Sequence, residues 1–317
     1  MKSWNEGIIM RNDFTYASCG AGLIHGLRWE PAGKPVAILQ IIHGVAEYAA
    51  RYDEFASFLA SKGFLVVAAD HMGHGGSLGE NGVKGHFEGG WFNTVADAYQ
   101  LLQNTRAAYP DVPYILLGHS MGSFMARTIL AKYPDSGIAA AIISGTAWMS
   151  GAVISAGLAA AAVVAKCQDP DQPSKLLNDM MFGSYNNKIE HKRTTHDWLT
   201  RDQKIVDAYV ADPLCGFSMT PGLAKDMMTG LKYIQTAKHL QQMDKDLPVL
   251  FIAGSDDPVG NYGKGVQQAV QAFRQAGMGN VKLRLYPMCR HEVLNELNRE
   301  EVYANILNWL KKQGFYA

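Results

Sequence analysis

Short apolar runs that alternate with longer amphipathic stretches are the strongest constraint on how this chain folds. Six such runs are bounded by glycine, proline or aspartate and lie at 36–42, 64–69, 114–117, 139–144, 249–253 and 281–286. Several are apolar at every position, as strands must be when helices cover both faces of their sheet. The runs therefore predict strands buried inside the molecule.

Stretches with helical periodicity separate these strands. They occupy 52–61, 92–109, 121–133, 262–275 and 300–312. Alternating strands and helices are typical of a mostly parallel sheet in a three-layer α/β domain. Two further runs, 14–18 and 24–29, are joined by a glycine-rich turn, which predicts an antiparallel hairpin at the edge of the sheet.

The alternation stops between Ala147 and about Leu240, where a long stretch separates two predicted strands. A crossover between parallel strands is usually much shorter, so we expect an inserted subdomain. We predict an α/β core made of residues 1–146 and 241–317, with a helical cap at 147–240. The cap begins with an alanine-rich stretch, 152–166, that predicts a helix.

The segment 136–165 carries no charge, and about 20 apolar residues suffice for a membrane span. Its residues are mainly small, and alanine and glycine contribute little to membrane insertion, so we do not expect a span. The alanine-rich helix has three possible roles: ordinary core, wall of an acyl pocket, or a surface that contacts lipid. Membrane contact through the cap would be peripheral at most.

Charge and cysteine content exclude several classes of partner and site. Lys plus Arg number 29, as do Asp plus Glu, so no net field attracts nucleic acid. The four cysteines form no C-x-x-C pair, which favours a reducing compartment over a disulfide framework. Residues 1–7 do not reach the apolar run of a secretory signal, and we expect a cytoplasmic protein. No glycine-rich phosphate loop follows the first strand, so we expect no nucleotide cofactor.

The pattern G-x-S-x-G occurs twice, at 75–79 and 118–122. Ser120 directly follows a predicted strand and directly precedes a predicted helix, which is the arrangement of a nucleophile elbow. The flanking glycines let the backbone turn sharply and lift the hydroxyl at the helix N-terminus. Ser77 follows no strand directly and leads into turn residues. We therefore predict that Ser120, not Ser77, is a nucleophile.

A serine hydroxyl attacks only when a base takes its proton and an acid orients that base. Both partners follow in the order serine, acid, histidine: Asp256 and Asp257 come after the strand 249–253, and His291 comes after 281–286. The carboxyl ends of parallel strands share one edge of a sheet, where α/β proteins build their sites. We predict His291 as the base and favour Asp257 over Asp256 as the acid, although spacing alone does not choose between them.

The oxyanion of a tetrahedral intermediate needs two backbone N–H donors. Met121, the residue after the predicted nucleophile, supplies one. The sequence His43-Gly44-Val45 follows the strand 36–42, where the second donor is expected. The Val45 N–H is our candidate, and Gly44 allows the turn that directs it.

With these residues in place, the sequence resembles the α/β-hydrolases, and within them the monoacylglycerol lipase and lysophospholipase group, often described as serine aminopeptidase-like. The motifs that carry the resemblance are His43-Gly44 with Glu47-Tyr48 and Arg51-Tyr52, Asp70-His71-Met72-Gly73-His74-Gly75-Gly76-Ser77, Gly118-His119-Ser120-Met121-Gly122, Asp257, His291, and in the insertion Arg201-Asp202, Val206-Asp207, Tyr209 and Asp212-Pro213-Leu214.

The resemblance implies an α/β-hydrolase fold with Ser120, Asp257 and His291 as a catalytic triad, and with Val45 and Met121 as the oxyanion hole. It implies a serine esterase that cleaves a monoacylglycerol, a lysophospholipid or a short-to-medium acyl ester through an acyl-enzyme, without a cofactor. The partner would be a small acyl ester or lipid. The chain departs from the lipases at Tyr48, where they usually place histidine, and in the alanine-rich start of its cap.

Other interpretations compete with this one. Related hydrolases cleave N-terminal residues from peptides, and an anionic cluster in the cap that could hold an α-amino group would favour that activity. A non-catalytic binding protein on the same fold is a second alternative, against which the complete triad argues. The spacing of Asp70, His71 and His74 could seat a metal, but in this family the segment packs a loop. Cys289 is most simply a small buried residue.

Overall fold

A single sheet organises the computed structural model, which describes residues 10–78 and 82–316. Its strands are β1 (Met10–Ala17), β2 (Leu23–Glu30), β3 (Ala37–Ile42), β4 (Phe64–Ala69), β5 (Tyr114–His119), β6 (Ile138–Ser144), β7 (Val249–Gly254) and β8 (Val281–Tyr286). They lie in the order β1-β2-β4-β3-β5-β6-β7-β8. β2 pairs antiparallel with β1 and β4, and the remaining neighbours are parallel.

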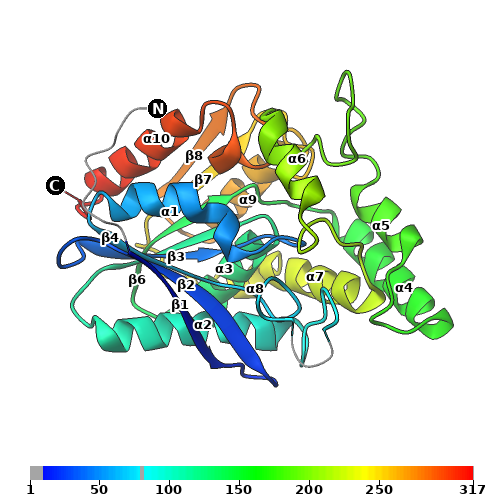
Figure 1. Ribbon diagram of the computed structural model, residues 1–317, viewed down its shortest axis with the longest axis horizontal. Coiled ribbons are helices and arrows are strands. Elements are labelled where there is room, and N and C mark those ends of the chain that lie inside the picture. Colours follow the sequence, from blue (N-terminus) through cyan, green and yellow to red (C-terminus); the bar gives the residue numbers. More distant parts are fainter. Residues whose placement is uncertain (1–9, 79–81, 317) are drawn as a thin grey trace.

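The helices follow the strands as the alternation predicted (Figure 1). They are α1 (Asp53–Ala60), α2 (Trp91–Ala108), α3 (Met121–Lys132), α4 (Gly151–Cys167), α5 (Lys175–Phe182), α6 (Gln203–Ala211), α7 (Pro221–Ile234), α8 (Ala237–Leu240), α9 (Lys264–Gln275) and α10 (Arg299–Lys312), with single turns of 3₁₀ helix at Ala49–Tyr52 and Val293–Asn295.

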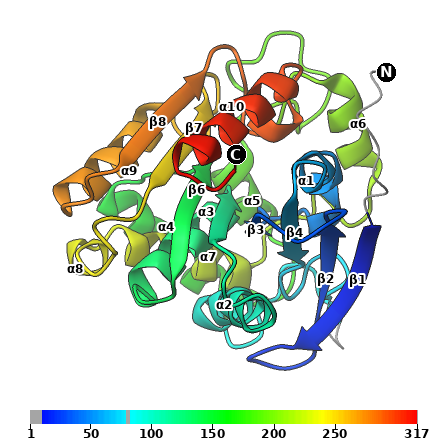
Figure 2. The same cartoon turned by 90° about the vertical axis from the view of Figure 1, so that its left-hand side faces the viewer.

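Each face of the sheet is covered by its own set of helices (Figure 2). Successive side chains of a strand point to opposite faces, so Leu39 and Ile41 of β3 join the cluster packed under α1 and α10. Ile38 and Ile42 join the other cluster, which includes α2, α3, α9 and the insertion helices α4 and α7. This double covering explains why the central strands are apolar at every position.

The predicted fold class is confirmed: the sheet is mostly parallel, helices flank it, and its edge is the antiparallel hairpin β1–β2. The predicted strands and helices match the observed ones to within about two residues at either end, except that β1 begins at Met10, four residues before its predicted start. Residues 1–7, where we predicted that no secretory signal occurs, lie outside the described residues.

The helices α4 to α8 lie between β6 and β7 in the described chain. α4 and α5 lie toward one end of the molecule, at the right of Figure 1, and α6 lies near its top. The division into a core at 1–146 and 241–317 and a cap at 147–240 stays a prediction. Among the described residues, no helix is both long enough and apolar enough to cross a membrane.

The insertion is attached to the body of the protein partly through α7, which packs on α2. Gly230 lies against the buried ring of Trp91 so closely that a Cβ at this position would overlap the ring. Gly222, near the start of the same helix, has no neighbour nearer than 3.3 Å to a Cβ placed there. The close approach of the two helices therefore depends on the missing side chain of Gly230.

We expect Gly230→Ala to lower the free energy of unfolding by about 1–3 kcal/mol, because the added methyl group overpacks this contact. Gly222→Ala, in the same helix, is the matched control and should change stability by less than about 1 kcal/mol. Urea unfolding followed by circular dichroism measures both variants. Equal stability of the two would contradict the packing argument.

Candidate active site

Ser120 lies at the turn between β5 and α3, with φ 53° and ψ −122°. A positive φ is strained for a residue other than glycine and persists only where the surroundings enforce it. A Cβ on Gly118 would overlap the carbonyl oxygen of Gly122, and a Cβ on Gly122 would overlap that of Ile42. The Ser120 N–H donates to the carbonyl of Ser144 at 3.0 Å, which holds the turn against β6.

Asp257 and His291 meet as a buried pair. His291 Nδ1 lies 3.1 Å from both carboxylate oxygens of Asp257, and both side chains are almost completely buried. The Val259 N–H also donates to Asp257 Oδ1, at 2.9 Å. Asp256 is exposed, and its carboxylate accepts from the hydroxyl of Ser255. Geometry therefore brings Asp257, and not Asp256, to the imidazole.

The second imidazole nitrogen of His291 takes no part in the pairing with Asp257. His291 Nε2 is buried and has no hydrogen-bond partner within the described part of the chain. Ser120 and His291 line the same cavity, but no hydrogen bond joins the Ser120 hydroxyl to this nitrogen. Hydrogen bonds of this kind are often long in a free enzyme and tighten when substrate binds.

Burial of the His291 imidazole opposes its protonation, but the neighbouring carboxylates, with Asp257 first among them, together outweigh burial and raise the pKa of His291. Glu292 and Glu47 act in the same direction from farther away. The neighbouring His119, whose ring centroid lies 4.7 Å from that of His291, is also buried, and burial lowers its pKa well below the usual value. His119 therefore stays neutral beside a more basic His291.

Two backbone N–H groups next to Ser120 have no acceptor among the residues described. One belongs to Met121, the first residue of α3, and the other to Val45. The Gly44 N–H, by contrast, donates to Glu47 Oε1 at 2.6 Å. The carbonyl of Ala46 accepts from the Tyr209 hydroxyl and the Gly216 N–H, both at 2.9 Å, so the loop after β3 is held on both sides of Val45.

The second G-x-S-x-G motif belongs to a hydrogen-bonded loop beside the site, and its last glycine, Gly79, lies outside the described residues. The Ser77 hydroxyl accepts from the His25 N–H at 2.8 Å, and Ser77 does not line the main cavity. Asp70 accepts from backbone N–H groups and from His25, and His71 Nε2 lies 2.9 Å from the carbonyl of His43. The hydrogen bonds of these polar atoms therefore stabilise the conformation of the loop.

A cavity of about 550 Å³ opens above Ser120 and His291. Much of its wall comes from the insertion, with apolar side chains of α5 and α7 and of Trp198. Phe124 and Met149 extend the apolar wall from the nucleophile side. Polar residues between 186 and 196 line another part. Such a mixture of apolar surface and a few polar groups is typical of a small-molecule site.

A buried ion cluster, to which the sequence analysis assigned no role, borders this cavity. Arg51 Nη1 donates to Glu47 at 2.6 Å and to Glu292 at 2.7 Å, and Nη2 donates to Glu292 at 2.8 Å. Glu47 Oε1 also accepts from the Tyr52 hydroxyl at 2.8 Å. The only available signal was that all these residues lie within, or next to, the motifs carrying the resemblance.

The Arg51 guanidinium donates one hydrogen bond to Glu47 and two to Glu292. Burial raises the pKa of Glu47, which has a single bond to Arg51. Burial acts in the same direction on Glu292, but the two bonds from Arg51 outweigh it and lower the pKa of Glu292 to about 2. Neither carboxylate is left without a hydrogen-bond donor.

Comparison with known proteins identifies a family and several relatives. A family model described as serine aminopeptidase, S33, matches residues 33–298. The monoglyceride lipase of Rattus norvegicus is 30% identical over 232 residues, covering 72% of this chain and 68% of that protein. The monoacylglycerol lipase of Mycolicibacterium smegmatis is 29% identical over 305 residues, covering 95% and 97%. The structure of a thermostable carboxyl esterase from Bacillus coagulans, in complex with glycerol, gives a TM-score of 0.87 at 28% identity, covering 95% of this chain and 98% of that chain.

Removing the shared cation should strongly destabilise the protein. We expect Arg51→Met to cost about 3–5 kcal/mol of unfolding free energy at pH 7, because it leaves buried carboxylates unpaired. Arg11→Met, which removes a guanidinium paired with Asp53 at an exposed site, is the control and should cost less than about 1 kcal/mol. Urea titration of both variants measures the difference.

The cost of Arg51→Met should also depend on pH. The pKa of Glu292 in the folded wild type, about 2, lies below its ordinary value of 4.5. Its ion pair therefore stabilises the wild type fully above pH 4.5, and this stabilisation is lost as the pH falls toward 2. The gap between wild type and Arg51→Met should narrow over that range. A gap independent of pH would argue against a charged Glu292.

Proposed function

The chain belongs to the serine aminopeptidase S33 family, in the monoacylglycerol lipase-like group of α/β-hydrolases, and we propose that Ser120 is the nucleophile with which this serine hydrolase cleaves carboxylic esters. His291 is the general base and Asp257 the acid that orients it. The Val45 and Met121 N–H groups form the oxyanion hole. The observation that carries this assignment is the buried Asp257–His291 pair: the Nε2 of His291 has no partner among the described residues, and His291 and Ser120 line one cavity.

In the first half of the reaction, the Ser120 oxygen attacks the ester carbonyl carbon while His291 Nε2 takes the hydroxyl proton. The carbonyl oxygen becomes an oxyanion and accepts hydrogen bonds from the Val45 and Met121 N–H groups. Asp257 stabilises the imidazolium that forms. The carbon–oxygen bond to the alcohol then breaks, the alcohol leaves with the proton from His291, and the acyl group stays on Ser120.

In the second half, water attacks the acyl-enzyme and gives its proton to His291 Nε2. Collapse of the second tetrahedral intermediate breaks the bond to Ser120, which recovers its proton from the imidazole, and the carboxylic acid is released. The raised pKa of His291 makes the imidazole a stronger base for taking the proton of Ser120 and of the attacking water. No atom or electron in this cycle requires a cofactor.

The substrate we propose is a monoacylglycerol, a lysophospholipid or a short-to-medium acyl ester. The apolar cavity walls provided by α5 and α7 suit an acyl chain, and the polar residues of the same cavity suit an alcohol group. The names of the Rattus and Mycolicibacterium relatives point to the same class. Peripheral membrane contact through the insertion and a cytoplasmic location stay predictions.

An aminopeptidase activity has the family description in its favour. It requires an anionic group that is free to bind an α-amino group. Glu47 and Glu292 line the cavity, but both already accept hydrogen bonds from Arg51. Asp179 also lines it and is paired with Lys175. These pairings favour an ester over a peptide as the substrate.

We expect Ser120→Ala and His291→Ala to abolish hydrolysis of p-nitrophenyl butyrate, a loss of at least about a thousandfold, because the reaction then lacks its nucleophile or its base. Ser77→Ala is the control and should keep near-normal turnover. A fluorophosphonate should label the wild type and Ser77→Ala but not Ser120→Ala. Near-normal activity of either triad variant would overturn the mechanism, and an unlabelled, inactive wild type would favour a non-catalytic binding protein.

The two aspartates can be separated by the same assay. We expect Asp257→Asn to reduce kcat by on the order of a thousandfold or more, because an amide cannot stabilise the imidazolium or fix its tautomer. Asp256→Asn is the matched neighbour, whose exposed carboxylate accepts from Ser255 and not from the imidazole, and it should retain kcat within about twofold. A larger loss for Asp256→Asn would mean that the wrong carboxylate has been assigned.

A further inference from the structure

The loop that carries His291 is hydrogen-bonded along its length to one segment of the insertion. We call residues 287–298 the histidine loop and residues 197–202 the insertion segment. The Glu292 N–H donates to the carbonyl of Leu199 at 2.7 Å, and the His291 N–H to that of Trp198 at 3.4 Å. The Thr200 hydroxyl donates to the carbonyl of Asn295 at 3.0 Å. The backbone around the imidazole is therefore supported from outside the α/β core.

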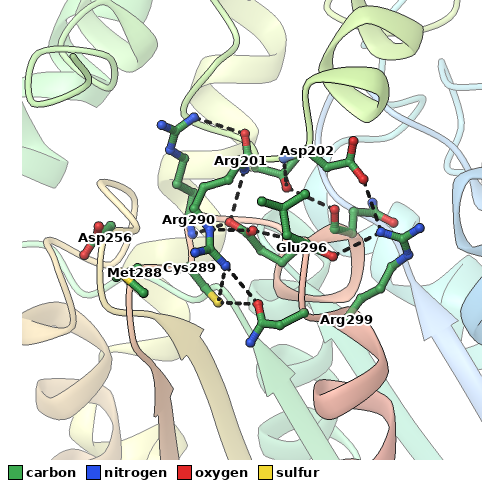
Figure 3. Close-up of polar contacts among 12 residues, drawn as sticks. Arg201, Asp202, Asp256, Met288, Cys289, Arg290, Glu296 and Arg299 are labelled. Atoms are coloured by element: carbon green, nitrogen blue, oxygen red, sulfur yellow. Dashed lines mark hydrogen bonds and ion pairs between the residues drawn. The ribbon is translucent and has the colours of Figure 1, made fainter. Parts of the chain in front are cut away.

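Glu296 lies at the centre of this contact (Figure 3). Its side chain is completely buried, and its Oε1 accepts from the Arg290 N–H at 2.8 Å and the Arg201 N–H at 3.2 Å. Its Oε2 accepts from Arg201 Nε at 2.9 Å and the Leu297 N–H at 3.0 Å. One carboxylate thus satisfies two donors of the histidine loop and two of the insertion segment.

Two arginines extend the contact in opposite directions. Arg201, from the insertion segment, reaches over the histidine loop and donates to Asn298 Oδ1 at 2.9 Å (Figure 3). Arg290, from the histidine loop, reaches back and donates to the carbonyls of Asp197 at 2.7 Å and Thr200 at 3.1 Å. Each segment therefore fixes the backbone of the other.

The insertion segment also contacts the imidazole ring itself. The ring of Trp198 lies 5.1 Å, centroid to centroid, from that of His291. The same indole packs on Phe182 and Tyr185, which line the cavity with it. Displacing the insertion segment would thus disturb the backbone of His291 and the packing of its ring.

We propose that Glu296 is a positioning residue for the reaction, which holds the imidazole of His291 in place by clamping the histidine loop to the insertion segment. This inference rests on the proposed function of Ser120 and His291. Glu296 touches no reacting atom and acts through the Arg290 N–H, one residue before the base. Its carboxylate charge is balanced by Arg201, so the role is geometric rather than that of an acid or base.

The test is Glu296→Gln, in the full chain, with p-nitrophenyl butyrate as substrate and active sites counted by fluorophosphonate titration. The amide nitrogen would face N–H donors and could accept from none of them, so one side of the clamp opens. Per active site, we expect kcat to fall about 10- to 100-fold, as small misplacements of catalytic groups do, with KM unchanged within about threefold.

The pH profile of kcat/KM gives a readout that simple destabilisation would not move. Asp257 raises the pKa of His291, so an imidazole that drifts from this carboxylate becomes less basic, and the acidic limb should shift to lower pH. The other ionisable groups around His291 are His119, Glu47, Arg51 and Glu292, and the substitution leaves them all in place. An unshifted limb together with wild-type kcat overturns the proposal.

Arg201→Lys is a second variant, in case Glu296→Gln fails to fold, because it keeps a positive charge beside the buried carboxylate of Glu296. The Arg201 side chain is a quarter exposed and its backbone N–H remains, so only part of the clamp is lost. We expect kcat to fall about three- to tenfold with KM unchanged. Glu30→Gln, at a partly exposed ion pair with Arg28 on strand β2, is the matched control and should behave as wild type.

The outcomes separate this inference from the proposed function. A wild type that neither takes the fluorophosphonate nor hydrolyses the ester refutes the proposed function. An active wild type whose kcat is matched by both Glu296→Gln and Arg201→Lys refutes the positioning role alone. A fall in kcat in both variants, with the acidic limb of Glu296→Gln shifted to lower pH and Glu30→Gln unaffected, supports it.

Discussion

The parallel pairing of β5, β6, β7 and β8 is the constraint on which the site depends. Gly118 pairs with Ile143, Ser144 with Ile252, and Gly254 with Tyr286, so four strand ends from distant parts of the chain finish at one edge. The residues that follow β5, β7 and β8 include Ser120, Asp257 and His291. Strand register thus brings together side chains separated by up to 171 positions in the printed sequence, and the local turns then direct each of them.

The fold was largely predictable because its signals are local. Apolar runs and helical periodicity report the strands and helices directly. The glycines around Ser120 mark a sharp turn, because a Cβ at Gly118 or Gly122 would overlap backbone atoms. The choice between Asp256 and Asp257 was different, since adjacent residues have almost the same spacing. Only their burial and orientation in the folded chain, with Asp257 enclosed and Asp256 exposed, separates them.

The charged groups around the site could not be predicted in the same way. Arg51 and Glu292 are 241 residues apart, and Arg201 and Glu296 are 95 apart. Ion pairs at such separations leave no periodic trace in one sequence, and a charged residue in a loop is usually solvated. Here burial makes the pairing obligatory, because an unpaired charge would be costly in this interior. The sequence contained the partners but not their pairing.

The contact between the insertion segment and the histidine loop has a consequence for recombining these proteins. Exchanging the insertion between relatives is an obvious way to transplant substrate preference. An exchange with its junctions at β6 and β7 would replace residues 197–202, whose Arg201 donates hydrogen bonds to Glu296 of the histidine loop. A better design leaves residues 197–202 of the recipient in place and exchanges the parts of the insertion before and after them. The recipient then keeps its own hydrogen bonds to the loop that carries the histidine. Residues 197–202 thus belong to the insertion by their position in the chain, but to the support of His291 by their contacts.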